Sequence, residues 1–204
     1  MRNDYIADKL TIEKDLDGLS LKMIKEHFKL YEGYVKKSNE IQQKLEAADK
    51  SEANGVYSYI GELKRQETFA VNGMKLHEVY FGELNSSPST SSGTIIEKMI
   101  AEDFGSMDAW KLDMVATGLA ARGWAILCYD FRDNKLHNYG ADGHNVGAVW
   151  GAIPLIALDI YEHAYFMDYG VNRKDYIASF FKNLDWNYVH GVVAQFALSE
   201  KHGA

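Results

Sequence analysis

Apolar positions recur at helical spacing through the first part of the chain. One stripe predicts an amphipathic helix that begins near Ser20, and a second, less regular stripe predicts another helix over residues 58–84, which contain no proline. The first stripe advances by three or four residues at a time, through Leu21, Ile24, Phe28, Tyr31 and Val35. Because the two helices are consecutive, we expect them to pack as an antiparallel hairpin.

A polar segment, residues 85–93, separates this helical part from the rest of the chain. It consists of Asn, Ser, Pro, Thr and Gly residues with no apolar member, a composition typical of turns and linkers. We therefore predict two domains, a helical hairpin domain over residues 1–92 and an α/β domain over residues 93–204.

The second part changes from helical to strand-like patterning and back again. Helices are expected at residues 95–104 and 107–121, the second with Ser106 as its N-cap. Shorter apolar or alternating runs then predict antiparallel strands at residues 124–131, 135–139 and 146–158. Further helices are expected from Ile160, over 173–184 and over 186–199. The predicted fold class is α+β, an α-helical hairpin followed by an α/β domain with a three-stranded antiparallel sheet.

Composition and charge narrow the classes of partner. The 204 residues carry a formal net charge of -7, which argues against nucleic-acid binding because that requires clustered Lys and Arg. No apolar run reaches the ~20 residues that span a bilayer, and the charged first residues lack the apolar stretch of a secretory signal. The one cysteine, Cys128, lies in an apolar run and cannot form an internal disulfide. We expect a soluble, cytoplasmic protein with neither a nucleic-acid nor a membrane partner.

Four residues are candidates for binding a metal. If Asp159 ends the third strand and His163 lies one turn into the next helix, the carboxylate and the imidazole converge on one ion. His27 and His77 each lie on the apolar stripe of a predicted helix, where a shared site or separate core packing would both explain them. Three imidazoles and one carboxylate suit iron, manganese or zinc, and the spacing does not choose among these metals.

The segment around these last two residues also resembles a known family. Residues 157–165, Ala-Leu-Asp-Ile-Tyr-Glu-His-Ala-Tyr, are similar to the Asp-x-Trp-Glu-His-Ala-Tyr signature of iron/manganese superoxide dismutases, with Tyr161 in place of the tryptophan. The similarity extends over nearly the whole chain after about residue 20. The other matching positions are His27, Tyr34, Val35, His77, residues 103–106, Gly123, Trp124 and residues 173–176.

The resemblance implies an enzyme and assigns its metal ligands. It implies that His27, His77, Asp159 and His163 bind one iron or manganese ion per subunit. Alternate oxidation and reduction of that ion would convert two superoxide radicals to oxygen and hydrogen peroxide. The identity of the metal stays open, because Gly73 is typical of manganese enzymes and a histidine near the bound solvent is typical of iron enzymes.

Two further residues receive catalytic roles from the resemblance. Tyr34 is expected to gate a hydrogen-bonded network that supplies protons. His144, fifteen residues before Asp159, is expected to hydrogen-bond the solvent molecule on the metal and so to tune the reduction potential.

The resemblance also implies a homodimer or a dimer of dimers. Glu162 is expected to cross a twofold interface and hydrogen-bond His163 of the partner subunit, with Tyr165 close by. The family usually has a histidine on the first helix that meets this tyrosine. Tyr31 is expected to take its place here.

Two alternatives remain beside the dismutase. A metal-binding relative with weak or no activity is one, because the outer residues depart from the family pattern, for example Phe81 where tryptophan is usual. The other is a non-catalytic helical interaction module in which every histidine packs in the core. A hydrolytic zinc enzyme is disfavoured, since no His-Glu-x-x-His helix supplies an adjacent general base.

Overall fold

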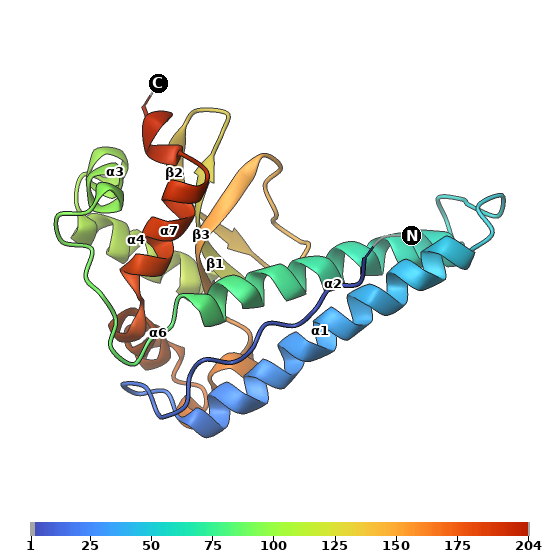
Figure 1. The fold of residues 1–204 in the computed structure, drawn as a ribbon, viewed down its shortest axis with the longest axis horizontal. Helices are drawn as coiled ribbons and strands as arrows, with labels where there is room; N and C mark the ends of the chain where they lie inside the picture. Colours follow the sequence, from blue (N-terminus) through green and yellow to red (C-terminus); the bar gives the residue numbers. More distant parts are fainter. Residues whose placement is uncertain (1–2, 204) are drawn as a thin grey trace.

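A long helical hairpin forms the first half of the molecule, as predicted. The computed structural model describes residues 3–203, and its hairpin consists of α1 (Leu21–Ala47) and α2 (Tyr59–Gly82). Each helix begins at a serine, Ser20 or Ser58, whose hydroxyl oxygen accepts a backbone N–H from the first turn. Figure 1 shows the hairpin extending well beyond the sheet, so that only its inner end lies beside the sheet.

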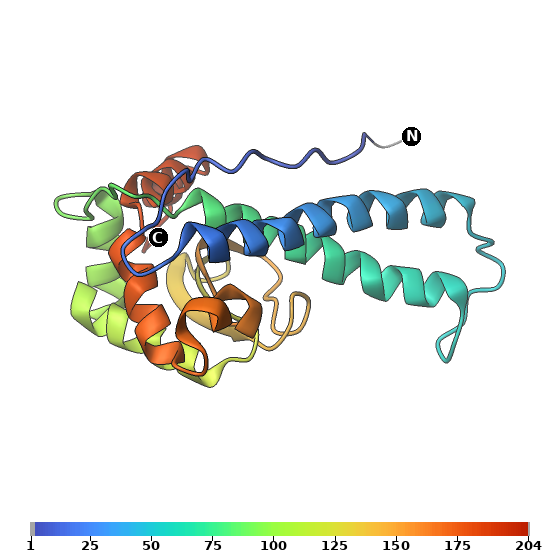
Figure 2. The same cartoon turned by 90° about the horizontal axis from the view of Figure 1, so that it is seen from below.

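The segment before α1 runs back along the hairpin (Figures 1 and 2). The Tyr5 backbone exchanges two hydrogen bonds with the Asn39 side chain, and the Asp8 N–H donates to the Tyr31 hydroxyl. Tyr31 also hydrogen-bonds Glu78 and is fully buried. In the single chain the Tyr31 hydroxyl is thus engaged by Asp8 and Glu78, and its expected contact at a subunit interface stays a prediction.

The second half contains the predicted three-stranded antiparallel sheet. Two helices precede it, α3 (Ile95–Phe104) and α4 (Met107–Ala120), and Ser106 caps α4 by accepting the Ala109 N–H. The strands are β1 (Trp124–Asp130), β2 (Lys135–Ala141) and β3 (Ala152–Asp159), in the order β2-β1-β3. The central strand β1 is buried almost throughout, and β3 ends at Asp159 as expected.

The third strand begins later than its apolar pattern predicted. The expected start was residue 146, but β3 begins at Ala152. Gly147 and Gly151 have φ values of 103° and 88°, a left-handed backbone that interrupts an extended strand. The intervening residues form an irregular loop on the surface.

The helices after the sheet are shorter and more broken than predicted. The helix expected from Ile160 is replaced by a 3₁₀ turn, η1 (Glu162–Ala164), and the short α5 (Phe166–Tyr169). The remaining elements are α6 (Arg173–Asn183), α7 (Trp186–Gln195) and η2 (Leu198–Glu200). The last predicted helix ends early because Ala197, with φ 50°, adopts a left-handed conformation.

The two halves share one hydrophobic core. Helix α2 packs along β3, η1 contacts α1, and α3, α4 and α7 contact the strands. The core cluster contains Ile24 and Tyr80 from the hairpin together with Trp124 and Leu158 from the sheet. This packing brings the inner ends of α1 and α2 against the end of β3. No helix within residues 3–203 is long and apolar enough to cross a membrane.

Candidate metal centre

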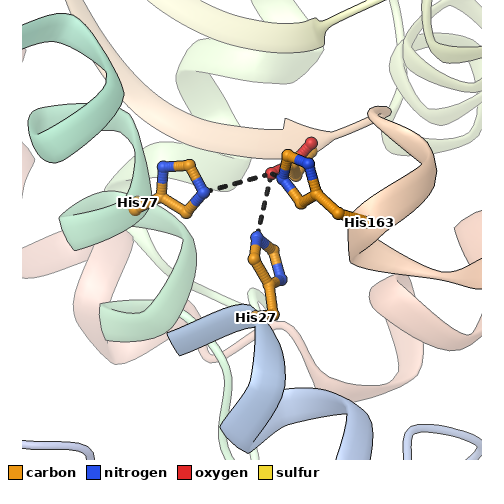
Figure 3. A group of neighbouring side chains, drawn as sticks. His27, His77 and His163 are labelled. Carbon is orange, nitrogen blue, oxygen red and sulfur yellow. Dashed lines mark hydrogen bonds and ion pairs between the residues drawn. The ribbon is translucent and has the colours of Figure 1, made fainter. Parts of the chain in front are cut away.

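Four side chains converge where the hairpin meets the sheet. His27 comes from α1, His77 from α2, Asp159 from the end of β3 and His163 from η1. The imidazoles of the three histidines point toward one another in Figure 3. The Asp159 Oδ2 atom lies 3.0 Å from His27 Nε2, 3.5 Å from His77 Nε2 and 3.1 Å from His163 Nε2. One ligand atom from each residue lies within 4.8 Å of all the others.

The three distances to Asp159 Oδ2 are those expected between ligands of a single metal ion. Two ligands that each lie about 2.1 Å from an ion are themselves roughly 3.0–3.5 Å apart at ordinary coordination angles. The His77 Nδ1–H donates to the Gly73 carbonyl oxygen over 2.6 Å, which leaves the lone pair on Nε2. That Nε2 atom is buried and has no hydrogen-bond partner among the described residues. An unpartnered basic nitrogen aimed at a carboxylate and two other imidazoles is the arrangement that a bound cation requires.

Burial favours the neutral form of His27 and His77, and hydrogen bonds favour the charged form of Asp159. Burial lowers the pKa of His77 to about 3 and also lowers the pKa of His27. Burial by itself raises the pKa of Asp159, but hydrogen bonds with His163 and His27 bring it below its usual range. The Asp159 carboxylate is therefore a negative charge in a fully buried place, and a cation would compensate the desolvation of that charge.

A second group, Tyr34, His144 and Trp124, lies beside the cluster. The Trp124 indole N–H donates to His144 Nδ1 over 2.9 Å, and His144 Nε2 lies 2.8 Å from the Tyr34 hydroxyl. Because indole is only a donor, Nδ1 has no proton in this tautomer, and the Nε2–H of the neutral ring donates to the Tyr34 oxygen. The Tyr34 hydroxyl proton is thus free to be donated elsewhere.

Both titratable groups of this chain of hydrogen bonds are neutral near pH 7. Burial lowers the pKa of His144 to about 4 and raises the pKa of Tyr34 to about 12. Tyr34 therefore keeps its proton over the whole physiological range, and His144 keeps one ring nitrogen unprotonated.

Gly73 makes room for these side chains. A Cβ atom at this position would lie 3.0 Å from the Tyr34 ring and 3.1 Å from the His144 ring. A longer side chain at residue 73 would have to displace Tyr34 or His144. The glycine is therefore explained by close approach, since the space beside α2 is filled from α1 and from the β2–β3 loop.

Aromatic rings line the rest of the site. Tyr161 stacks on His163, with ring centroids 5.2 Å apart and planes at 14°. Phe81 contacts His27 with a centroid distance of 5.0 Å, and Phe69 lies 4.6 Å from the His144 ring. We did not assign a role to Trp124 or Phe69 from the sequence. The Gly-Trp pair at 123–124 matches the family pattern and could have pointed to Trp124. Its hydrogen-bond partner, His144, lies twenty residues away on a loop, which no local pattern predicts.

The two residues expected at a subunit interface differ in exposure. Glu162 is exposed and makes no ion pair with any residue in the described range 3–203, whereas Tyr165 is buried. The Tyr165 ring stacks on Tyr176, and its hydroxyl accepts the Arg173 Nε–H over 3.3 Å. Only Glu162 is therefore free in the single chain to reach another molecule.

The fold and the site together define a class of protein in which a helical hairpin and an α/β domain share a cluster of three histidines and one aspartate. Residues 92–191 match the family described as iron/manganese superoxide dismutases, C-terminal domain. The chain is 45% identical over 181 residues to the iron superoxide dismutase of Aquifex pyrophilus, covering 87% of this chain and 85% of that one. It is 36% identical over 188 residues to manganese superoxide dismutase 1 of Haloferax volcanii, covering 91% and 92%. The chain belongs to the iron/manganese superoxide dismutase family.

Proposed function

We propose that His27, His77, Asp159 and His163 hold one iron or manganese ion and that the chain dismutes superoxide at this ion. The observation that carries the proposal is the unpartnered, buried Nε2 of His77 beside the Asp159 carboxylate and two more imidazoles. Membership of the family supports the same conclusion, since its relatives are named as iron or manganese superoxide dismutases.

The reaction needs electrons and protons at one place. When bound, iron or manganese supplies alternate one-electron oxidation and reduction, so that two superoxide ions and two protons become one oxygen and one hydrogen peroxide. The Asp159 carboxylate balances part of the ion's charge, and the packing around His27, His77 and Asp159 excludes bulk water from the buried side. The side chain of His163 is 27% exposed in the single chain, so the cluster is covered less completely on this side than by the hairpin.

Tyr34 and His144 supply the proton-handling part of the site. The indole of Trp124 fixes the His144 tautomer, and His144 in turn donates to the Tyr34 oxygen. Tyr34 is then held as a neutral proton donor next to the cluster, 5.4 Å from the His77 ring between centroids. The role of His144 toward solvent on the metal stays a prediction, since its Nε2 is already engaged by Tyr34.

Elemental analysis and a superoxide assay on the same purified sample test this function. We expect about one iron or manganese per chain and catalytic loss of superoxide that disappears with the metal. A sample that contains the metal and leaves superoxide unchanged would support the inactive relative instead. A sample without metal, whose stability does not respond to a chelator, would support the interaction module.

We further propose that the chain forms a homodimer or a dimer of such dimers through the face that carries His163. Exposed apolar side chains near this face support an interface, among them Phe166, Met167 and Val171, the last of which is 89% exposed. Glu162 would accept a hydrogen bond from His163 of the partner subunit and so link assembly to metal geometry.

The proposed compartment is the cytoplasm. Cys128 is a free, buried thiol, and burial raises its pKa to about 12, so it is unreactive and compatible with a reducing environment.

A further inference from the structure

One buried carboxyl group takes no part in the site described above. Glu83 follows the last residue of α2, is 0% exposed, and makes no ion pair with any residue between 3 and 203. Burial raises the pKa of Glu83 well above its usual range, which favours the neutral acid. Burial of an acidic group that has no cationic partner is unfavourable. The hydrogen bonds of Glu83 therefore indicate what this residue contributes to the fold.

Glu83 binds the free edge of β3. The strand order β2-β1-β3 leaves β3 with an unpaired outer edge, and the Ala157 N–H on that edge lies 3.1 Å from Glu83 Oε1 and 3.3 Å from Oε2. Ala157 is two residues before Asp159, so the same edge carries the Asp159 carbonyl oxygen. Glu83 thus fills the place that a neighbouring strand would otherwise occupy.

A pair of tyrosines binds the next position on this edge. The Tyr176 hydroxyl donates to the Asp159 carbonyl oxygen over 2.8 Å, and its oxygen lies 3.2 Å from the Tyr80 hydroxyl. His77 and Tyr80 lie on α2 and Glu83 is its C-cap residue, at successive steps of three, so one helix end carries a proposed ligand, the partner of Tyr176 and the edge contact to β3.

We infer that Glu83 and Tyr176 are positioning residues that hold the backbone of β3, and with it Asp159, in register with the helix that carries His77. The inference rests on the proposed function, because it concerns two of the proposed ligands. Loss of either contact would let the end of β3 move relative to α2 and would change the 3.5 Å separation of Asp159 Oδ2 from His77 Nε2. Supporting residues of this kind set metal affinity without touching the metal.

Binding of Co²⁺ to the metal-free protein tests the inference, because its visible spectrum reports ligand geometry independently of dismutase activity. Glu83→Leu removes the acceptor, whereas Glu83→Gln keeps a neutral acceptor for the Ala157 N–H. We expect Glu83→Leu to change the Co²⁺ spectrum and weaken Co²⁺ binding about tenfold, and Glu83→Gln to restore both. Tyr176→Phe keeps the ring and is expected to change the spectrum in the same direction, and it serves if Glu83→Leu fails to fold.

Asn183→Leu is the matched control. Asn183 is also buried and hydrogen-bonded, but its side chain bonds the Asp17 backbone and the Ser179 carbonyl oxygen, and it makes no hydrogen bond to β3 within the described residues. Asn183→Leu should lower the melting temperature, and its Co²⁺ spectrum should be the same as that of the parent. Parental spectra in Glu83→Leu and Tyr176→Phe, or a Glu83→Gln variant no better than Glu83→Leu, would overturn the inference. A parent chain that binds no Co²⁺ at all would overturn the proposed function, and this inference with it.

Discussion

The hairpin and the α/β domain each contribute two residues to the cluster, but they hold them differently. His27 and His77 sit on long helices with capped starts, and both are buried. In the domain, Asp159 is just as buried at the end of β3, whereas His163 lies on a single 3₁₀ turn with a partly exposed side chain. The hairpin and Asp159 therefore form the closed wall of the site, and His163 lies on its open side.

This difference separates two tasks within one centre. Residues on the closed side fix geometry, because any movement there must disturb packed helices and a buried carboxylate. His163 on the open side is available to a second subunit. Because neither half holds all four residues, metal binding is also expected to join the halves.

The largest expected effect comes from replacing ligands on the two sides. His77→Ala and His163→Ala should both abolish stoichiometric iron or manganese and dismutase activity, as should alanine at His27 or Asp159. The variants should also lose the stability that metal binding adds. At a metal concentration a hundredfold above Kd, their free energy of unfolding should be about 2.7 kcal/mol lower than that of the parent, which lowers Tm by roughly 5–10 °C. Metal analysis and calorimetry check this. Full metal occupancy in two of the four variants would refute the ligand set.

The same two variants sharpen the comparison when no metal is present. His77→Ala opens a cavity in the closed wall and should destabilise the metal-free protein by roughly 2 kcal/mol or more. His163→Ala removes a partly exposed ring and should change the metal-free Tm by only a few degrees. Equal losses in the two metal-free variants would contradict the division into closed and open sides.

Glu162→Ala tests the open side as a subunit contact. We expect the dimer to dissociate at a higher protein concentration and the metal to be released faster, because His163 loses the acceptor on its second ring nitrogen. Sedimentation at several concentrations and metal analysis after dialysis measure both effects. Glu200→Ala, an exposed acid on η2, is the control and should resemble the parent. A variant that stays dimeric when dilute and keeps its metal would rule out the bridge.

Tyr34→Phe tests the proton-handling residues where the two halves touch. The metal should remain, but turnover should fall about tenfold if the lost hydroxyl contributes about 1.4 kcal/mol to the proton-dependent step. The decrease should be steepest at high pH and high superoxide concentration, measured by stopped-flow absorbance.

His144→Ala should also keep the metal and shift its reduction potential. Parental turnover in His144→Ala would remove His144 from the mechanism.

The smallest expected effect is a pH dependence of the metal-free protein. Burial lowers the pKa of His144 to about 4, whereas in the unfolded chain it lies near 6.5. Between these values the unfolded state binds the extra proton, so the free energy of unfolding should fall as the pH decreases. His27 and His77 act in the same direction, since burial lowers the pKa of each. Urea titrations at several pH values measure this free energy. Between pH 6.5 and 4 it should change less steeply with pH in His144→Gln than in the parent, and an equal pH dependence would contradict the assignment.

Local features of the fold followed from the sequence where neighbouring residues decide the structure. The stripe that begins near Ser20 predicted α1, Ser106 predicted the start of α4, and Asp159 was expected at the end of β3. Errors occurred where backbone conformation breaks a regular pattern. Gly147 and Gly151 delay β3, and the region around His163 forms a 3₁₀ turn where a regular helix was expected.

The sequence by itself determined the candidate ligands, because the residue types that bind iron or manganese and the signature around His163 are written in the chain. It also determined the elements that carry them, since helical periodicity and caps act within a few residues. Only the tertiary structure brought His27 to Asp159 across 132 positions, and Tyr34 to His144 across 110. It alone fixed the tautomers, through Gly73 on His77 and Trp124 on His144, and it alone placed Glu83 on the edge of β3. The physical reason is that these contacts arise from packing the hairpin on the sheet, and no local pattern records which distant side chains that packing brings together.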